Sequence, residues 1–190
     1  MSRGKLVEFL KSKLMVGSFI VPTYYGHRTI GDMVEVKVID ELSGDYNVVE
    51  GKTKRSIDDF SIGSDLYDVK THHENEGGFS MPNLISVKRL KGVLEDENKT
   101  LSYVFVDYTR NGDDVTITDV DIKYVWELDW SMLSIGALGK GQLQIKDANK
   151  KLVFTDIGRD EWFKILKVKV LEFYQKELTK IGKEIDLWNV

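Results

Sequence analysis

Residues 56–71 read SIDDFSIGSDLYDVKT, and this stretch sets the architecture expected for the chain. Its first half alternates apolar and polar residues, which is typical of a strand with one buried face. The sequence at positions 63–65, Gly-Ser-Asp, is typical of a compact turn. We therefore expect strands at residues 56–62 and 66–71, joined as a hairpin.

Acidic residues occur on both strands of this hairpin. Asp68 and Lys70 are two positions apart, so they project from the same face of a strand, and Asp59 lies on the strand before them. Two carboxylates can hold a divalent cation, and a lysine can activate water or neutralise developing charge, as metal-assisted phosphodiester hydrolysis requires. Asp58 is the alternative first carboxylate, but only Asp59 is followed by apolar residues at the next and third positions. A surface hairpin with an incidental ion pair is the competing interpretation.

The acid-x-Lys triplet has no specificity by itself, because composition alone predicts roughly four acid-x-base triplets in a chain like this. Glu35 and Lys37 form a second such triplet, on a predicted strand that has no acidic neighbour across a tight hairpin. Asp121 and Lys123 form a third, in an alternation typical of a solvated strand face. The hairpin at 56–71 is therefore the favoured site.

Composition narrows the class of protein. The 190 residues are 42% hydrophobic and 31% charged with two prolines, which is typical of a globular chain. The absence of cysteine excludes thiol catalysis, iron–sulfur clusters and Cys-ligated zinc. A net charge of -4 does not indicate a nucleic-acid-binding protein, although it leaves room for a local basic cleft. The apolar N-terminal segment is interrupted by Glu8, Lys11 and Lys13, and no apolar run is long enough to span a bilayer, so we expect a cytoplasmic protein without a membrane partner.

The remaining pattern predicts an α/β fold, with a mixed central sheet flanked by helices, in a single domain over residues 1–190. The strongest hairpin signal is Asn111-Gly112. Asn83 or Ser80 is the expected cap of the middle helix. The expected helices are at residues 4–15, from 82 or 83 to 94, and 160–185. The expected strands are at residues 33–39 and 46–50 as a hairpin, 56–62, 66–71, 101–109, 115–126, 142–146 and 152–155, with a glycine-rich loop at 134–141.

At residues 56–71 the sequence resembles the PD-(D/E)xK nuclease superfamily, and within it the type II restriction endonucleases. The family pattern is an acid, a hairpin, and then acid-x-Lys on the next strand; Asp59 precedes Asp68 by nine positions. The proline that usually precedes the first acid is absent. Two further stretches, 79–86 and 135–145, resemble restriction-enzyme-like proteins only loosely.

The resemblance implies a Mg²⁺-dependent endonuclease that cuts double-stranded DNA at specific sequences. It implies that Asp59, Asp68 and the Val69 carbonyl are Mg²⁺ ligands and that Lys70 acts on the attacking water. Some family members add a glutamate from an N-terminal helix. Glu8 is the candidate here, with a solvated acid as the alternative. A homodimer is expected, because two-fold symmetry would give each DNA strand of a palindromic target its own active site.

Several polar residues are candidates for DNA contacts. Glutamine can read adenine in the major groove, and lysine, histidine and asparagine can contact phosphates or bases. A solvent-exposed strand or loop is the alternative for each. These candidates are His72, Asn83, Lys140, Gln142 and Gln144.

Two other functions compete with a restriction enzyme. One is a repair or recombination nuclease that reads DNA structure instead of sequence. The other is a non-catalytic interaction protein in which the Asp-Val-Lys strand is incidental, and the net charge of -4 favours it.

Overall fold

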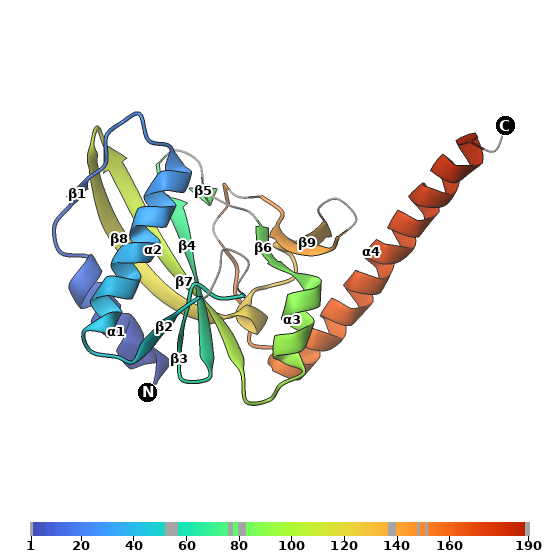
Figure 1. Ribbon diagram of the computed structural model, residues 1–190, viewed down its shortest axis with the longest axis horizontal. Helices are drawn as coiled ribbons and strands as arrows, with labels where there is room; N and C mark the ends of the chain where they lie inside the picture. The colour runs from blue at the N-terminus through green and yellow to red at the C-terminus, as the bar shows by residue number, and fades with distance from the viewer. Residues whose placement is uncertain are drawn as a thin grey trace.

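The computed structural model describes residues 2–51, 57–75, 78–79, 83–136, 140–147, 149–150 and 152–188 (Figure 1). The helices are α1 (Arg3–Leu14), α2 (His27–Ser43), α3 (Val87–Leu94) and α4 (Arg159–Trp188), with a 3₁₀ turn η1 (Val125–Glu127). The strands are β1 (Phe19–Ile20), β2 (Val48–Glu50), β3 (Phe60–Ile62), β4 (Asp65–His73), β5 (Gly78–Phe79), β6 (Asn83–Ser86), β7 (Thr100–Asn111), β8 (Asp114–Tyr124), β9 (Leu133–Gly136) and β10 (Gln142–Ile145).

The larger sheet has the strand order β1-β8-β7-β4-β3-β2, and β5 pairs with the end of β4. Strands β4 and β7 are parallel over nine residue pairs, from Asp65–Thr100 to His73–Tyr108, while the other pairings in this sheet are antiparallel. Helices cover both faces. This arrangement confirms the predicted mixed sheet flanked by helices.

A second sheet packs beside the first. It has the strand order β6-β10-β9 with antiparallel pairing throughout. Figure 1 shows that α3 and the beginning of α4 lie on the same side of the molecule as this small sheet, whereas α1 and α2 lie on the other side.

Two hydrophobic cores lie on the two faces of the larger sheet, because successive side chains of a strand point in opposite directions. The first core joins α1 and α2 to the sheet, through Leu6, Leu10, Leu14, Ile30, Val34, Val38, Leu42, Val104, Val106, Val120 and Ile122. The second core joins α3, the small sheet and the start of α4 to the other face, through Leu90, Val93, Leu101, Tyr103, Phe105, Leu143, Ile145, Trp162 and Leu166.

The predicted strand at residues 33–39 is wrong, because this segment belongs to helix α2. Ile30, Val34, Val38 and Leu42 are spaced four apart and are all fully buried, as one face of a helix requires. A strand would bury Val36 on the same face as Val34 and Val38, but Val36 is 57% exposed. The predicted hairpin with residues 46–50 is absent for the same reason, and β2 pairs with β3 instead.

The middle helix begins later than predicted. Residues 83–86 form strand β6, and α3 starts at Val87. The N-cap is Ser86, whose hydroxyl accepts a hydrogen bond from the backbone N–H of Arg89. Asn83 is therefore not the cap, and the alternative, Ser80, lies outside the described residues.

The two hairpins marked by turn residues are confirmed. Gly63 has a φ of 64° between β3 and β4, and Gly112 has a φ of 61° between β7 and β8, a region that favours glycine. The helices predicted at 4–15 and 160–185 and the strand predicted at 142–146 are also present. In contrast, residues 152–155 contribute a single bridge, Leu128–Phe154, and part of the expected loop at 134–141 forms β9.

None of the helices in the described ranges has the length and apolar character needed to cross a membrane.

Trp162 fixes the start of α4 in the second core. Its side chain is fully buried, its ring centroid lies 4.7 Å from that of Trp130, and its indole N–H donates to the carbonyl of Leu128 at 2.8 Å. We expect Trp162→Ala to lower the free energy of unfolding by about 3–5 kcal/mol, because it leaves a large cavity. Trp162→Phe should cost about 1–2 kcal/mol, since it retains most of the volume and loses the hydrogen bond.

Urea unfolding measures both changes. Leu187→Ala is the control on the same helix, because Leu187 is 75% exposed and its removal should change stability by less than about 0.5 kcal/mol. A Trp162→Ala variant as stable as this control would contradict the anchoring role.

Candidate active site

The β3–β4 hairpin brings together the acids and the lysine that the sequence singles out. Asp68 and Lys70 project from one face of β4, and the Lys70 Nζ donates to Asp68 Oδ1 at 2.5 Å. A second contact, of 3.4 Å, joins the same Nζ to the carbonyl oxygen of Val69. Both side chains are nearly buried, at 14% exposed for Lys70 and 12% for Asp68, so water screens this pair weakly.

Asp59 lies directly before β3 and reaches across to β4. Its Oδ2 accepts the backbone N–H of Val69 at 2.7 Å, which holds the carboxylate beside Asp68. The backbone N–H of Asp59 also donates to the carbonyl of Tyr67 at 2.8 Å. Between the two alternatives of the sequence analysis, it is Asp59 that the structure places in the cleft with Asp68 and Lys70.

Glu35 is a further carboxylate at this place, and the sequence analysis missed it. It comes from the middle of α2 and lines the same cleft as Asp59 and Asp68. A strand at residues 33–39, as the sequence predicts, would keep Glu35 away from the hairpin. The signal that could have revealed it is the recurrence of apolar residues at every fourth position of α2, Ile30, Val34, Val38 and Leu42, which indicates a helix. Glu8, the candidate from an N-terminal helix, is exposed on α1 and does not line the cleft.

The buried acids hold protons more strongly than ordinary carboxyls do. Burial, with a smaller contribution from the charge of Asp59, raises the pKa of Asp68 to about 8, although the neighbouring Lys70 opposes the rise. Burial likewise raises the pKa of Glu35 to about 7, with Asp59 and Asp32 adding to the effect and Lys70 reducing it. The acids and the lysine therefore form one electrostatically coupled group.

Tyr103 closes the inner wall of this group. It is fully buried on β7, next to Asp68 in the parallel register, and Lys70 Nζ lies 5.8 Å from its ring centroid. Burial together with the charges of Asp68 and Asp59 raises the pKa of Tyr103 well above its usual range. The phenol therefore stays neutral and supplies a low-polarity wall.

The donors present suit a hard cation such as Mg²⁺. Asp59, Asp68 and Glu35 offer carboxylate oxygens and Val69 offers a carbonyl oxygen, and Mg²⁺ prefers oxygen ligands. A cation would also favour the ionised form of Asp68, which burial and, to a smaller extent, the charge of Asp59 disfavour. Within the described ranges, however, no three Asp, Glu or His side chains already stand close enough to grip an ion. The chemistry of the donor set fits a divalent cation, and Lys70 Nζ is the cationic group that contacts Asp68 in this structure.

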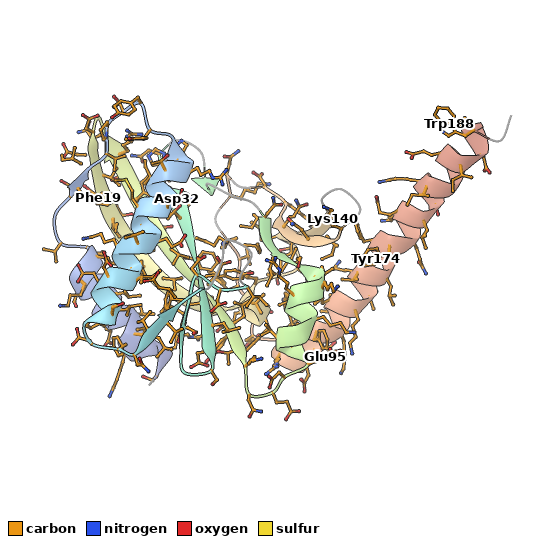
Figure 2. All side chains as sticks on the ribbon, in the orientation of Figure 1. Phe19, Asp32, Glu95, Lys140, Tyr174 and Trp188 are labelled. Carbon is orange, nitrogen blue, oxygen red and sulfur yellow. The ribbon has the colours of Figure 1, made fainter. Side chains whose placement is uncertain are left out.

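These groups line a cleft of ≈ 550 Å³ between α2, β4, α3 and the small sheet. Figure 2 labels Asp32 on α2 and Lys140 beside the small sheet, which mark two opposite walls. Arg28, Arg89 and Lys140 line the cleft with exposed side chains, whereas Asp68 at its base is buried. These three cations are thus further out than Asp68, and among the described acids of the cleft the exposed Asp32 is the one that lies at their level.

The structure gathers most of the predicted DNA-contacting residues at this cleft. Asn83, Lys140 and Gln142 line it, and the amide of Gln144 donates to Asn83 Oδ1. His72 does not line it. Its Nδ1 lies 3.2 Å from Asp107 Oδ1, in a separate hollow that Asp107, Asp119, Asp121, Phe105, Leu152 and Phe154 complete.

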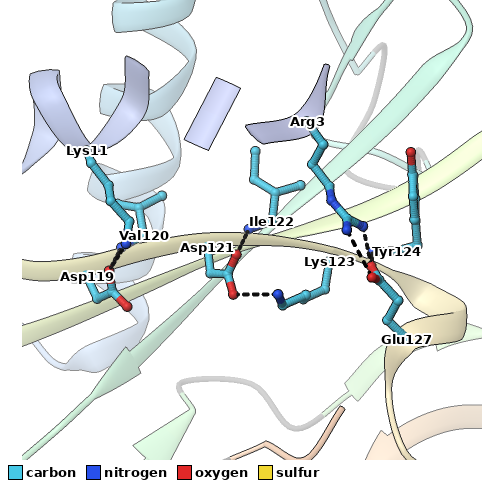
Figure 3. A network of polar contacts seen from close by, with 9 residues as sticks. All are labelled: Arg3, Lys11, Asp119, Val120, Asp121, Ile122, Lys123, Tyr124 and Glu127. Atoms are coloured by element: carbon cyan, nitrogen blue, oxygen red, sulfur yellow. Dashed lines mark hydrogen bonds and ion pairs between the residues drawn. The ribbon is translucent and has the colours of Figure 1, made fainter. Parts of the chain in front are cut away.

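The acid-x-Lys triplet on β8 has a different environment. Asp121 and Lys123 form an ion pair of 2.9 Å, with side chains that are 40% and 26% exposed (Figure 3). On the same strand Asp119 pairs with Lys11 of α1 at 2.6 Å. This triplet occupies a partly solvated strand face, as the sequence pattern indicates, and it is a natural control for the one on β4.

Comparison with known proteins supports the fold. No family model matches the chain, and no curated protein matches it in sequence. Among solved structures, the NlaIV restriction endonuclease superposes with a TM-score of 0.60 at 14% sequence identity, over 80% of this chain and 70% of that one. The chain therefore has a restriction-endonuclease-like fold.

The raised pKa of Asp68 makes the stability of the metal-free protein depend on pH. An unfolded aspartate ionises near pH 4, whereas folded Asp68 keeps its proton up to about pH 8, so the folded state binds more protons between these values. The contribution of Asp68 to stability therefore falls as pH rises from about 4 to 8. In EDTA we expect Asp68→Asn to raise the Tm above that of the parent by about 5 °C at pH 8.5, and to differ from it by less than about 2 °C at pH 5.

Thermal unfolding followed by circular dichroism tests this expectation. Asp121→Asn removes a partly exposed aspartate from the other triplet and should give no gain that depends on pH. An Asp68→Asn gain of the same size at both pH values would show that Asp68 does not titrate in this range.

Proposed function

We propose that the chain is a Mg²⁺-dependent endonuclease that hydrolyses phosphodiester bonds of double-stranded DNA. The observation that carries the proposal is the convergence of Asp59, Asp68 and Lys70 in one cleft of a restriction-endonuclease-like fold. The solved neighbour is a restriction endonuclease by name, and the residues in this cleft have the chemistry that such a reaction needs.

In this proposal Asp59, Asp68 and the Val69 carbonyl hold Mg²⁺, and Glu35 adds a carboxylate from α2. When bound, the ion supplies Lewis-acid stabilisation of the negative charge that develops on the phosphate oxygens. Asp59 is positioned for this role because the Val69 N–H already holds one of its oxygens. Metal binding would displace the Lys70 ammonium from Asp68, since both are cations on the same carboxylate.

Lys70 is the proposed catalytic residue that acts on the attacking water. Its Nζ contacts Asp68 Oδ1 and the Val69 carbonyl, the two groups proposed to hold the ion, so a phosphate bound to that ion would lie within reach of the ammonium. There it can orient the water and neutralise charge on the pentavalent phosphorus in the transition state. The buried wall of Tyr103 strengthens these interactions by excluding solvent.

The outer part of the cleft supplies the proposed DNA contacts. The exposed cations Arg28, Arg89 and Lys140 would bind backbone phosphates, which reconciles DNA binding with a net charge of -4. Gln142 and the hydrogen-bonded Asn83–Gln144 pair carry amides, which pair bidentately with adenine. These amides favour sequence-specific recognition, and the proposal therefore takes the chain to be a type II restriction enzyme. By the symmetry of a palindromic site, it would act as a homodimer.

Cleavage of a long unmethylated duplex tests the proposal. The parent protein should give discrete fragments with Mg²⁺ and none with EDTA. Asp68→Ala and Lys70→Ala should each slow cleavage by roughly 100- to 1,000-fold or more, because each removes charge stabilisation at the reacting phosphate. Asp121→Ala and Lys123→Ala, in the partly solvated triplet, should cut at the parent rate.

The pattern of products separates the alternatives. A Mg²⁺-dependent smear that Asp68→Ala abolishes would retain the active site and remove the site-specific part of the proposal. Preference for branched DNA would favour a structure-specific nuclease. Absence of cleavage on several DNAs would favour a non-catalytic interaction protein.

Glu35 gives a second prediction with a matched control. Glu35→Gln should lower the Mg²⁺-dependent rate by about 10- to 100-fold at limiting Mg²⁺, because it removes a charge from the metal-binding group while keeping the shape of the side chain. Glu8→Gln, on the exposed face of α1, should leave the rate unchanged. Mg²⁺ titrations of the cleavage rate measure both, and equal curves for the two variants would remove Glu35 from the site.

A further inference from the structure

The C-terminal half of α4 extends away from the rest of the molecule. Figure 1 shows the helix leaving the side of the small sheet and continuing well past it. Within α4 the described buried residues are Trp162 and Leu166, both in the first two turns. Among the described residues, the hydrogen bond furthest along α4 that reaches the body is from the Tyr174 hydroxyl to the carbonyl of Lys140, at 3.3 Å; Figure 2 labels both residues.

From Leu171 onwards the helix remains apolar along one stripe. Five of the six stripe residues are more than half exposed, and Tyr174 is 38% exposed. A polar helix face would be expected if this segment served only as a solvated tail. We call the stripe the α4 seam; it consists of Leu171, Tyr174, Leu178, Ile181, Ile185 and Trp188.

The spacing of the α4 seam is that of a coiled coil. Its residues follow one another at intervals of three, four, three, four and three, which is the a and d pattern of a heptad repeat. A stripe with this 3.5-residue period drifts around a straight helix and stays on one face only when two helices supercoil around each other. From this spacing we infer that the α4 seam binds the α4 seam of a second copy of this chain, as a parallel two-stranded coiled coil.

The charges beside the seam favour the parallel orientation. Glu177 and Glu184 occupy the g positions, while the e positions hold the uncharged Gln175 and Gly182. In a parallel pair each g residue faces an e position of the other helix, so neither glutamate opposes a like charge. In an antiparallel pair g faces g, which would place Glu177 of each helix against Glu184 of the other.

The seam is large enough for a specific interface. Two copies bring together twelve seam side chains, and burial of roughly 100 Å² for each gives about 1,200 Å² in total. This is the lower edge of the area that specific protein–protein interfaces bury.

The parallel orientation also has a consequence for DNA cleavage, and this consequence rests on the proposed function. It places both globular bodies at the same end of the coil, so that their two clefts would face one DNA duplex. An antiparallel coil would place the bodies at opposite ends. The α4 seam alone predicts the interface, which does not require that the protein cut DNA.

Light scattering coupled to size-exclusion chromatography tests the interface on the full chain without DNA. The parent should have twice the monomer mass of 21.8 kDa. Leu178→Glu should raise the dimer Kd at least about 100-fold, because it places a charge in the seam of both copies. Thr179→Glu adds the same charge at the next residue, on another face, and should remain dimeric. Circular dichroism should show equal folding of both variants, since both positions are exposed.

Orientation has its own test, which the absence of native cysteine makes clean. In a parallel coil residue 185 lies opposite its own copy, so Ile185→Cys should form an intermolecular disulfide on oxidation, whereas Thr179→Cys should not.

A monomeric parent, a dimer that Leu178→Glu leaves intact, or an assembly of more than two chains would overturn the proposal. A dimer in which Ile185→Cys fails to cross-link would overturn the parallel arrangement. Because mass and cross-linking require no cleavage, a dimer without nuclease activity would count against the proposed function alone.

Discussion

The parallel pairing of β4 with β7 is the constraint on which the other features depend. It runs over nine residue pairs at the centre of the larger sheet, and β4 is hydrogen-bonded on its other edge to β3 and β5. On that edge β3 and β5 pair only with the two ends of β4, and between them the Val69 N–H donates to the Asp59 side chain. Held in this way, β4 presents Tyr67 and Val69 to the first core and Asp68 and Lys70 to the opposite face. A shift of one residue would exchange these two sets and bury the ion pair among aliphatic side chains.

Local sequence predicted the parts of the structure that depend on local chemistry. The turns at Gly63 and Gly112 require a positive φ, so the hairpins that hold the motif and form β7–β8 could be read directly from residues near each turn. The fold class followed from the order of such elements. Asp59, Asp68 and Lys70 could be predicted as a group for the same reason, since one short hairpin carries all three.

The parts that sequence reasoning missed depend on contacts between distant segments. Val34, Glu35 and Val38 fit a strand period over seven residues as well as a helix period, and only Ile30 and Leu42, outside that window, settle the helix. Because residues 33–39 were predicted as a strand away from the hairpin, Glu35 was not expected to lie near Asp59 and Asp68. Strand β6 was missed because its partner β10 lies nearly sixty residues away, so that pairing, and not propensity, keeps Asn83–Ser86 extended.

The exposed cations of the cleft explain how an acidic chain can present positive charge at its opening, beside the exposed acid Asp32. Asp68 is buried at the base of the cleft, while Arg28, Arg89 and Lys140 are exposed further out. Much of the remaining acidity lies elsewhere, for example on β8, where Lys11 and Lys123 partly neutralise Asp119 and Asp121 (Figure 3). Net charge is therefore a poor guide to the potential inside the cleft, since a buried acid contributes little field to solvent when a lysine is beside it.

Helix α2 has a consequence for what counts as the smallest working unit of this protein. One face of the helix packs Ile30 and Val34 into the first core, and another presents Arg28 and Glu35 to the cleft. The hairpin with its three signature residues is consequently not a portable module. If the hairpin were grafted onto another sheet, it would carry Asp59, Asp68 and Lys70. It would lack both the Glu35 carboxylate and the Arg28 side chain, which come from α2. The first fifty residues contain none of the three signature residues, yet they supply Arg28 and Glu35 to the cleft, so the smallest working unit includes α2.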